Sequence, residues 1–129
     1  MAPISVTLAP RDPPAAVVAL VGEHDAYSAG RLEGELRVLL EEGRRIVVDL
    51  CDTEFIDSTT LAALLAARRS AAGAGLGFTV VLPKQNYTQV NQLLDLTGLG
   101  SSFAIFDTVD EALTAARAGK SGSHKRFVA

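Results

Sequence analysis

The sequence predicts a single α/β domain with a mixed, mainly parallel sheet of about five strands and about four helices. Two observations favour this fold class. Runs rich in β-branched and other apolar residues alternate along the chain with segments whose apolar residues recur at helical spacing. The length, 129 residues, is that of one ordinary domain. Because alternating strands and helices imply parallel crossovers, helices should cover the sheet.

The N-terminal part of the chain predicts two neighbouring strands and a helix. Residues 4–8 and 16–21 are apolar runs, and the proline-rich segment 10–14 separates them, so a pair of strands is expected. A helix is expected over 26–42, with Gly43 as its stop. One face of that helix carries its leucines, which are Leu32, Leu36, Leu39 and Leu40.

The remainder of the chain predicts three further strand–helix units. Strands are expected over 45–50, 78–82 and 103–106, and helices over 58–72, 88–96 and 108–118. Residues 52–54 are expected to form a turn. Thr108 and Glu111 predict a capping box, in which the hydroxyl accepts from the Glu111 N–H and the Glu111 side chain reaches back to the Thr108 N–H. The domain is expected to span 1–118, and 119–129 to form a flexible tail.

Composition and charge exclude several classes of protein. Hydrophobic residues make up 48% of the chain and charged residues 21%, which allows a packed core. The formal net charge of −3 argues against nucleic acid as the main partner. No apolar run reaches the roughly 20 residues that span a bilayer, and the N-terminus lacks the features of a signal peptide. The lone cysteine, Cys51, allows no internal disulfide, fits a reducing cytoplasm, and is expected to be a small core residue.

Four successive polar residues, Asp57, Ser58, Thr59 and Thr60, stand at the start of an apolar helix. The first N–H groups of a helix lack intrahelical acceptors and carry partial positive charge. The position therefore suits either a capping side chain or a phosphate group. Spacing alone favours the simpler interpretation, in which Asp57 or Ser58 is an N-cap worth about 1 kcal/mol.

A resemblance to a known family favours the phosphate site over the simple N-cap. Residues 22–25 (GEHD) resemble the G-E-L-D element of the anti-sigma factor antagonist family, whose fold is the STAS domain, and residues 57–61 (DSTTL) resemble its D-S-S/T-G-L element. Residues 93–99 (LLDLTGL) are similar to its late helix ending in T-G-L, and residues 103–113 (FAIFDTVDEAL) to its last strand–helix junction. The ordered set covers roughly residues 4–117.

The resemblance implies a function as a switchable binding protein. In this family the serine after the aspartate is phosphorylated by a partner, an anti-sigma factor with serine kinase activity, and a protein phosphatase restores the unmodified form. The unmodified form sequesters that partner and releases a sigma factor, which controls transcription in settings such as stress responses. The acceptor here is then Ser58, with Thr59 as the alternative. The expected partner-binding residues are Glu23, Asp25, Asp57, Ser58, Thr59 and Thr60.

The same resemblance implies a protein that is not an enzyme and holds no cofactor or metal. Nucleotide and Mg²⁺ would belong to the kinase. The sequence shows neither a glycine-rich phosphate loop nor a cluster of metal ligands, and its histidines are His24 and His124. Neither direct nucleic-acid binding nor membrane attachment is expected, and the expected compartment is the cytoplasm.

Two positions depart from the family pattern. Thr60 stands where the family usually has glycine, and its branched side chain is expected to narrow partner access to Ser58. His24 stands where an apolar residue is usual and is expected to be a partly exposed loop residue. Because Thr60 is atypical, a STAS domain that binds a partner or small ligand without phosphorylation stays open as an alternative. The strand–helix junctions also leave open an enzyme on a flavodoxin-like α/β fold.

Overall fold

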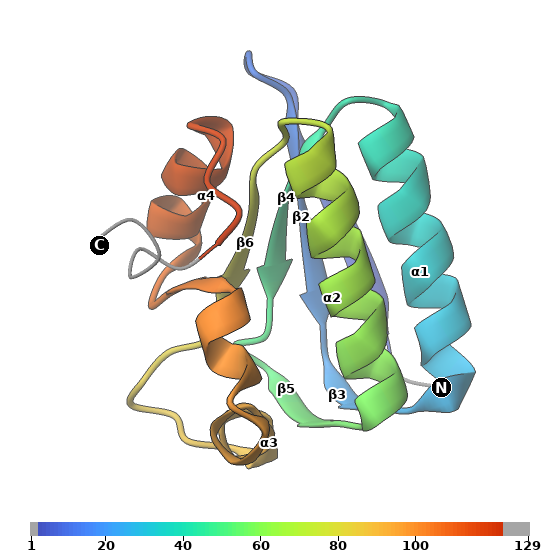
Figure 1. Ribbon diagram of the computed structural model, residues 1–129, viewed down its shortest axis with the longest axis vertical. Helices are drawn as coiled ribbons and strands as arrows, with labels where there is room; N and C mark the ends of the chain where they lie inside the picture. The colour runs from blue at the N-terminus through green and yellow to red at the C-terminus, as the bar shows by residue number, and fades with distance from the viewer. Residues whose placement is uncertain (1–2, 123–129) are drawn as a thin grey trace.

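A computed structural model describes residues 3–122, which form a sheet with helices on both faces (Figure 1). Five strands form the main sheet in the order β1-β2-β4-β6-β7. Their bounds are β1 Ile4–Ala9, β2 Ala15–Leu20, β4 Arg45–Asp49, β6 Phe78–Val81 and β7 Ala104–Phe106. β1 pairs antiparallel with β2, and the other neighbours are parallel. The expected mixed, mainly parallel sheet and its initial pair of neighbouring strands are confirmed.

The described chain has four α-helices, as the sequence predicted. Their bounds are α1 Ala26–Glu41, α2 Ser58–Gly73, α3 Gln89–Thr97 and α4 Val109–Arg117, and a short 3-10 helix, η1, spans Leu99–Ser102. Three of the α-helices cover the main sheet, and α3 packs against the short strand β5 (Thr53–Ile56) at one end of the molecule (Figure 1). The large core includes Leu32 and Leu36 of α1, Leu64 of α2 and Phe78 of β6. α1 and α2 therefore cover one face of the sheet. α4 covers the other face, where Ala112 and Ala116 pack against Val47 and Val81.

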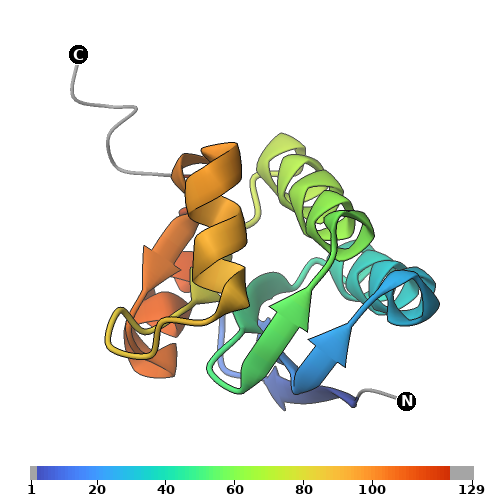
Figure 2. The same cartoon turned by 90° about the horizontal axis from the view of Figure 1, so that it is seen from below.

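A second, two-stranded sheet was not predicted from the sequence. β3 (Gly22–His24) pairs in parallel with β5 (Thr53–Ile56), at the end of the molecule where α1 and α2 begin (Figure 2). The expectation that residues 52–54 form only a turn is therefore wrong from Thr53 onward. The sequence pattern did not indicate these strands, because each is short and carries polar side chains that are exposed to solvent.

The predicted capping box of α4 is half right. The Thr108 hydroxyl accepts from the Glu111 N–H at 3.2 Å. The Glu111 carboxylate, however, accepts from the Thr108 hydroxyl at 3.1 Å instead of from its backbone N–H. A complete capping box occurs at α3, between Thr88 and Asn91, where the sequence predicted a helix but no box.

The first residues of the predicted tail are bonded to the domain. The carbonyl of Lys120 accepts from the Phe78 N–H at 2.8 Å, and that of Ser121 accepts from the Arg68 guanidinium at 3.4 Å. Residues 123–129 of that tail lie outside the described residues. The boundary at residue 118 stays a prediction.

Gly77, the residue before β6, lies directly against α4. A Cβ at this position would overlap the carbonyl oxygen of Ala116 and lie 2.7 Å from the Ala116 Cα. The obstacle is backbone, which cannot move aside as the end of a flexible side chain can. Only glycine therefore lets α4 approach the sheet this closely.

We expect Gly77→Ala to lower the free energy of unfolding by about 1–3 kcal/mol, because the added methyl forces α4 away from the sheet. The matched control is Gly34→Ala within α1, where an added Cβ meets nothing within 4 Å. That control should stabilise the protein by up to about 1 kcal/mol through helix propensity. Urea unfolding of both variants measures the difference, and equal stabilities would contradict the packing argument.

Candidate functional site

The pairing of β3 with β5 brings two helix N-termini together. His24 is in register with Ile56, and the Asp57 N–H donates to the His24 carbonyl at 3.1 Å. Each strand leads directly into a helix, β3 into α1 and β5 into α2, so the predicted site residues 23–25 and 57–60 meet at one end of the fold (Figure 2). The sequence suggested this neighbourhood only through the family resemblance.

Asp57, and not Ser58, caps α2. Asp57 has extended backbone geometry, and its Oδ1 accepts from the Thr60 N–H at 2.9 Å. That bond satisfies one of the free N–H groups of the first turn. The two candidates that spacing left open are thereby separated, because the capping role needs one side chain and Asp57 supplies it.

Ser58 is the first residue of α2, and its side chain is exposed. In the described part of the chain, neither its hydroxyl nor its backbone N–H has a hydrogen-bond partner. Thr59 is exposed in the same way. Ser58 therefore presents a hydroxyl that no structural role occupies, at the positive end of a 16-residue helix.

Asp25 caps α1 as Asp57 caps α2. Its Oδ1 accepts from the Tyr27 N–H at 2.9 Å, and its side chain is exposed. Both carboxylates are thus held at helix starts, where negative charge is favourable. Two of the predicted partner-binding residues therefore lie at the surface in a defined geometry.

Thr60 is fully buried, at 0% exposure, which overturns the expectation that it narrows access to Ser58. Its hydroxyl points into the protein and donates to the His24 carbonyl at 3.2 Å. The third position of a helix faces a different direction from the first, so a side chain here turns inward. The Thr60 side chain therefore offers no surface to a partner in this conformation, and a role for this residue in partner binding stays a prediction.

His24 is also fully buried, at 0% exposure, so the expectation of a partly exposed loop residue is wrong. Its Nε2 donates to the Val21 carbonyl at 3.1 Å, since a carbonyl oxygen can only accept. Its Nδ1 lies 3.0 Å from the Ser28 hydroxyl. Strand alternation places this side chain inside while Glu23 points outward, and the bonds to both ring nitrogens make its burial tolerable.

Gln89 is a residue of this neighbourhood that the sequence analysis missed. Its carboxamide bonds twice to the backbone of Ile56: Nε2 donates to the carbonyl and Oε1 accepts from the N–H, each at 3.0 Å. A polar residue at the start of α3 gives no sign in the sequence of a contact 33 positions away. Only the folded chain shows it.

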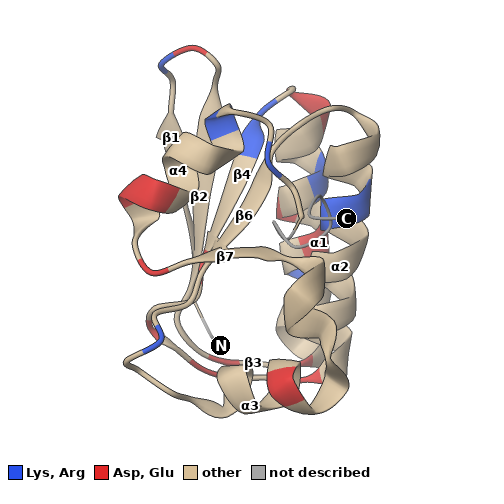
Figure 3. Ribbon diagram, turned by 60° about the vertical axis from the view of Figure 1, so that its left-hand side comes forward, with Lys and Arg blue, Asp and Glu red and all other residues tan. Residues whose placement is uncertain are grey.

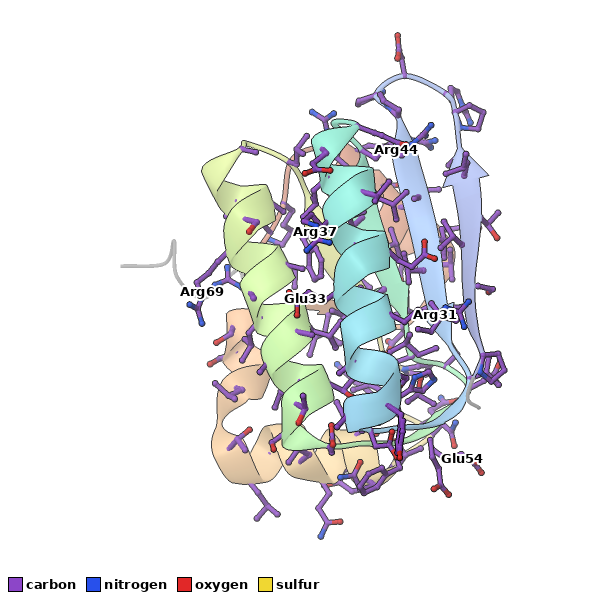
Figure 4. All side chains as sticks on the ribbon, turned by 90° about the vertical axis from the view of Figure 1, so that its right-hand side faces the viewer. Arg31, Glu33, Arg37, Arg44, Glu54 and Arg69 are labelled. Carbon is purple, nitrogen blue, oxygen red and sulfur yellow. The ribbon has the colours of Figure 1, made fainter. Side chains whose placement is uncertain are left out.

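The surface around Ser58 is acidic. Glu23, Asp25, Asp52 and Glu54 are exposed on β3, β5 and the adjoining loops, and Asp57 is half-buried. Residues 22–30 and 46–67 contain no Lys or Arg. In Figure 3 most of the Lys and Arg residues, drawn in blue, lie toward the opposite end of the molecule. In Figure 4 the Glu54 side chain points away from the fold.

Ser58 lines neither of two hollows on the described surface. One hollow, of about 860 Å³, lies beside β7 and is lined by Leu94, Phe103 and Ile105 among others. Another, of about 370 Å³, lies between α1 and α2 near Leu36 and Ala67. Among residues 3–122, no group of His, Cys, Asp and Glu is arranged to hold a metal ion. No described helix is long and apolar enough to cross a membrane.

Cys51 is half-buried beside the β4 strand and packs against the smaller core. Burial, with the neighbouring carboxylate of Asp49 as a second cause, raises the pKa of its thiol to about 12. A thiol with so high a pKa carries almost no thiolate near neutral pH. This agrees with a packing role.

Comparison with known proteins gives concordant matches over most of the chain. The family described as "Mlab, STAS domain" matches residues 8–106. The anti-sigma-F factor antagonist RsfB of Mycobacterium tuberculosis is 32% identical over 121 residues, which are 92% of this chain and 96% of RsfB. Solved structures of this fold include an anti-sigma factor antagonist from Mycobacterium paratuberculosis, with 30% identity and a TM-score of 0.68 over 89% of this chain and 95% of that one.

More distant structures share the fold. Unphosphorylated SpoIIAA, an anti-sigma factor antagonist, superimposes with a TM-score of 0.67 at 14% identity, over 87% of this chain and 94% of its own. Bacillus SpoIIAA in its phosphorylated form gives a TM-score of 0.61 at 19% identity, over 85% of this chain and 97% of its own. With the STAS match and the identity to RsfB, these findings place this chain in the anti-sigma factor antagonist family, as a STAS domain.

Proposed function

We propose that this protein binds an anti-sigma factor with serine kinase activity, and that phosphorylation of Ser58 by that partner releases it. The observation that carries the proposal is the exposed, unbonded hydroxyl of Ser58 beside a cap that Asp57 already supplies. A serine needed for capping would be a poor switch, because modifying it would weaken the helix. Ser58 is free of that conflict.

A phosphate on Ser58 is compatible with the fold. The backbone N–H groups of Ser58 and Thr59 have no acceptor among the described residues, and the helix dipole favours negative charge there. The modification should therefore leave α2 intact. Its effect is local and acts on the surface that a partner would contact.

The acidic surroundings explain how a phosphate would block binding. It adds about −1.5 to −2 charges beside Asp57 and Asp25, which already carry negative charge. An anti-sigma factor that binds the unmodified surface would then meet a higher density of negative charge. Removing water from those charges in the interface would also cost free energy. The buried position of Thr60 supports the assignment, because its side chain leaves Ser58 unobstructed.

The proposal places the protein in the cytoplasm, as a binding component and substrate and not as an enzyme. The kinase would supply nucleotide and Mg²⁺, and a protein phosphatase would regenerate the unmodified form. Release of a sigma factor would then couple this cycle to transcription.

Affinity capture from a lysate of the source organism tests the switch. Wild type and Ser58→Ala should retain the same anti-sigma factor, identified by mass spectrometry, and Ser58→Glu should lose it. The matched control is Ser70→Glu, the same substitution at the exposed far end of α2. Equal capture of that anti-sigma factor by all four proteins would contradict a switch at Ser58.

Incubation of the purified chain with the captured anti-sigma factor and Mg-ATP tests the acceptor. Intact-mass spectrometry should show one added phosphoryl group on wild type and on Thr59→Ala, but none on Ser58→Ala. Far-ultraviolet circular dichroism of the modified protein should match the unmodified spectrum. A product modified at Thr59 alone would make Thr59 the acceptor. An unshifted mass would favour a STAS domain that binds its partner without phosphorylation.

Removal of the Thr60 hydroxyl tests whether that residue is structural. Thr60→Val should lower the free energy of unfolding by about 1 kcal/mol, because the His24 carbonyl loses one donor. Thr60→Ser keeps the hydroxyl and serves as the control. Both variants should still bind the anti-sigma factor, and a selective loss of binding by a stable Thr60→Val protein would place Thr60 in the interface after all.

A further inference from the structure

We propose that Gln89 is a positioning residue for the switch: its carboxamide holds the backbone of β5 in the conformation that presents Ser58 to the partner. The inference rests on the proposed function and adds α3 to the elements that control it. Its basis is the pair of 3.0 Å bonds between Gln89 and both backbone groups of Ile56.

The geometry of a parallel strand explains why these bonds matter. Successive residues of β5 direct their N–H and C=O groups to opposite sides. The groups on one side face β3, as the Asp57 N–H does with the His24 carbonyl. The groups of Ile56 face the other side, where no strand lies in the described chain, and there Gln89 takes the place of a neighbouring strand.

Gln89 is itself held rigidly. It is the first residue of α3, which the Thr88–Asn91 capping box fixes in place. The next residue, Val90, is fully buried in the main core. The carboxamide therefore connects a rigid helix start to a strand that ends two residues before Ser58, and it does so through two partly buried bonds to a residue that is only 1% exposed.

Loss of this connection should loosen the switch without removing any group from its surface. Without the Gln89 carboxamide, both backbone groups of Ile56 lose their hydrogen-bond partners, and the remaining backbone bonds of this segment run to β3. A segment that spends less time in the binding conformation has a proportionally weaker apparent affinity. Partner affinity should therefore fall although Gln89 itself makes no contact with the partner.

The experiment compares four proteins: wild type, Gln89→Ala, Gln89→Glu and the control Gln92→Ala, an exposed position on the same helix. Affinity for the purified anti-sigma factor captured by wild type is measured by calorimetry, and amide exchange at residues 55–60 by NMR. Gln89→Ala should speed exchange of the Ile56 amide and weaken binding about tenfold. Gln92→Ala should stay within about twofold of wild type in both measurements.

Gln89→Glu separates the two bonds and guards against a misfolded alanine variant. The carboxylate can still accept from the Ile56 N–H, but its second oxygen faces the Ile56 carbonyl oxygen and cannot donate to it, so faster exchange and weaker binding are expected in this variant too. Faster Ile56 exchange with unchanged affinity in both Gln89 variants would overturn the proposal, and so would weaker binding without faster exchange, which would mean direct contact. If wild type captures no anti-sigma factor, the proposed function fails instead, and that failure is seen before any Gln89 variant is measured.

Discussion

The carbonyl oxygen of His24 is the point on which the candidate site depends. It accepts from the Asp57 N–H at 3.1 Å and from the Thr60 hydroxyl at 3.2 Å, so one backbone atom ties β3 to the start of α2. The His24 side chain is anchored below it through Val21 and Ser28. This junction joins the strand that leads into α1 to the first turn of α2, and so brings the acidic residues of both segments close to Ser58.

The two departures from the family pattern belong to this same junction. Thr60 replaces the usual glycine and His24 replaces the usual apolar residue, and in the folded chain the first donates to the backbone of the second. Each adds a polar group to the interior, and each finds partners for it. The two departures therefore change the buried hydrogen bonds beneath the site and not its surface. The exposed residues there are Glu23, Asp25, Ser58 and Thr59.

The main sheet and its helices were predictable because their signals are local and strong. Runs such as 45–50 and 78–82 are long enough to show as buried strands, and the leucines of α1 mark its inner face. β3 and β5 were not predicted, because three- and four-residue strands with polar side chains show no such pattern. The capping box at Thr88 was not predicted, because Asn91 stands at the position where the usual pattern has glutamate or glutamine.

Order and spacing along the chain were enough to predict the fold class and the polar cluster at the start of α2, and the family was predicted from the resemblance of four short motifs to known ones. The role of each side chain at the site could be assigned only from the folded structure. Asp57 caps, Thr60 and His24 turn inward, Ser58 stays free, and Gln89 reaches Ile56 from 33 residues away. The physical reason is that hydrogen-bond partners and burial depend on neighbours in space, which spacing along one chain does not specify.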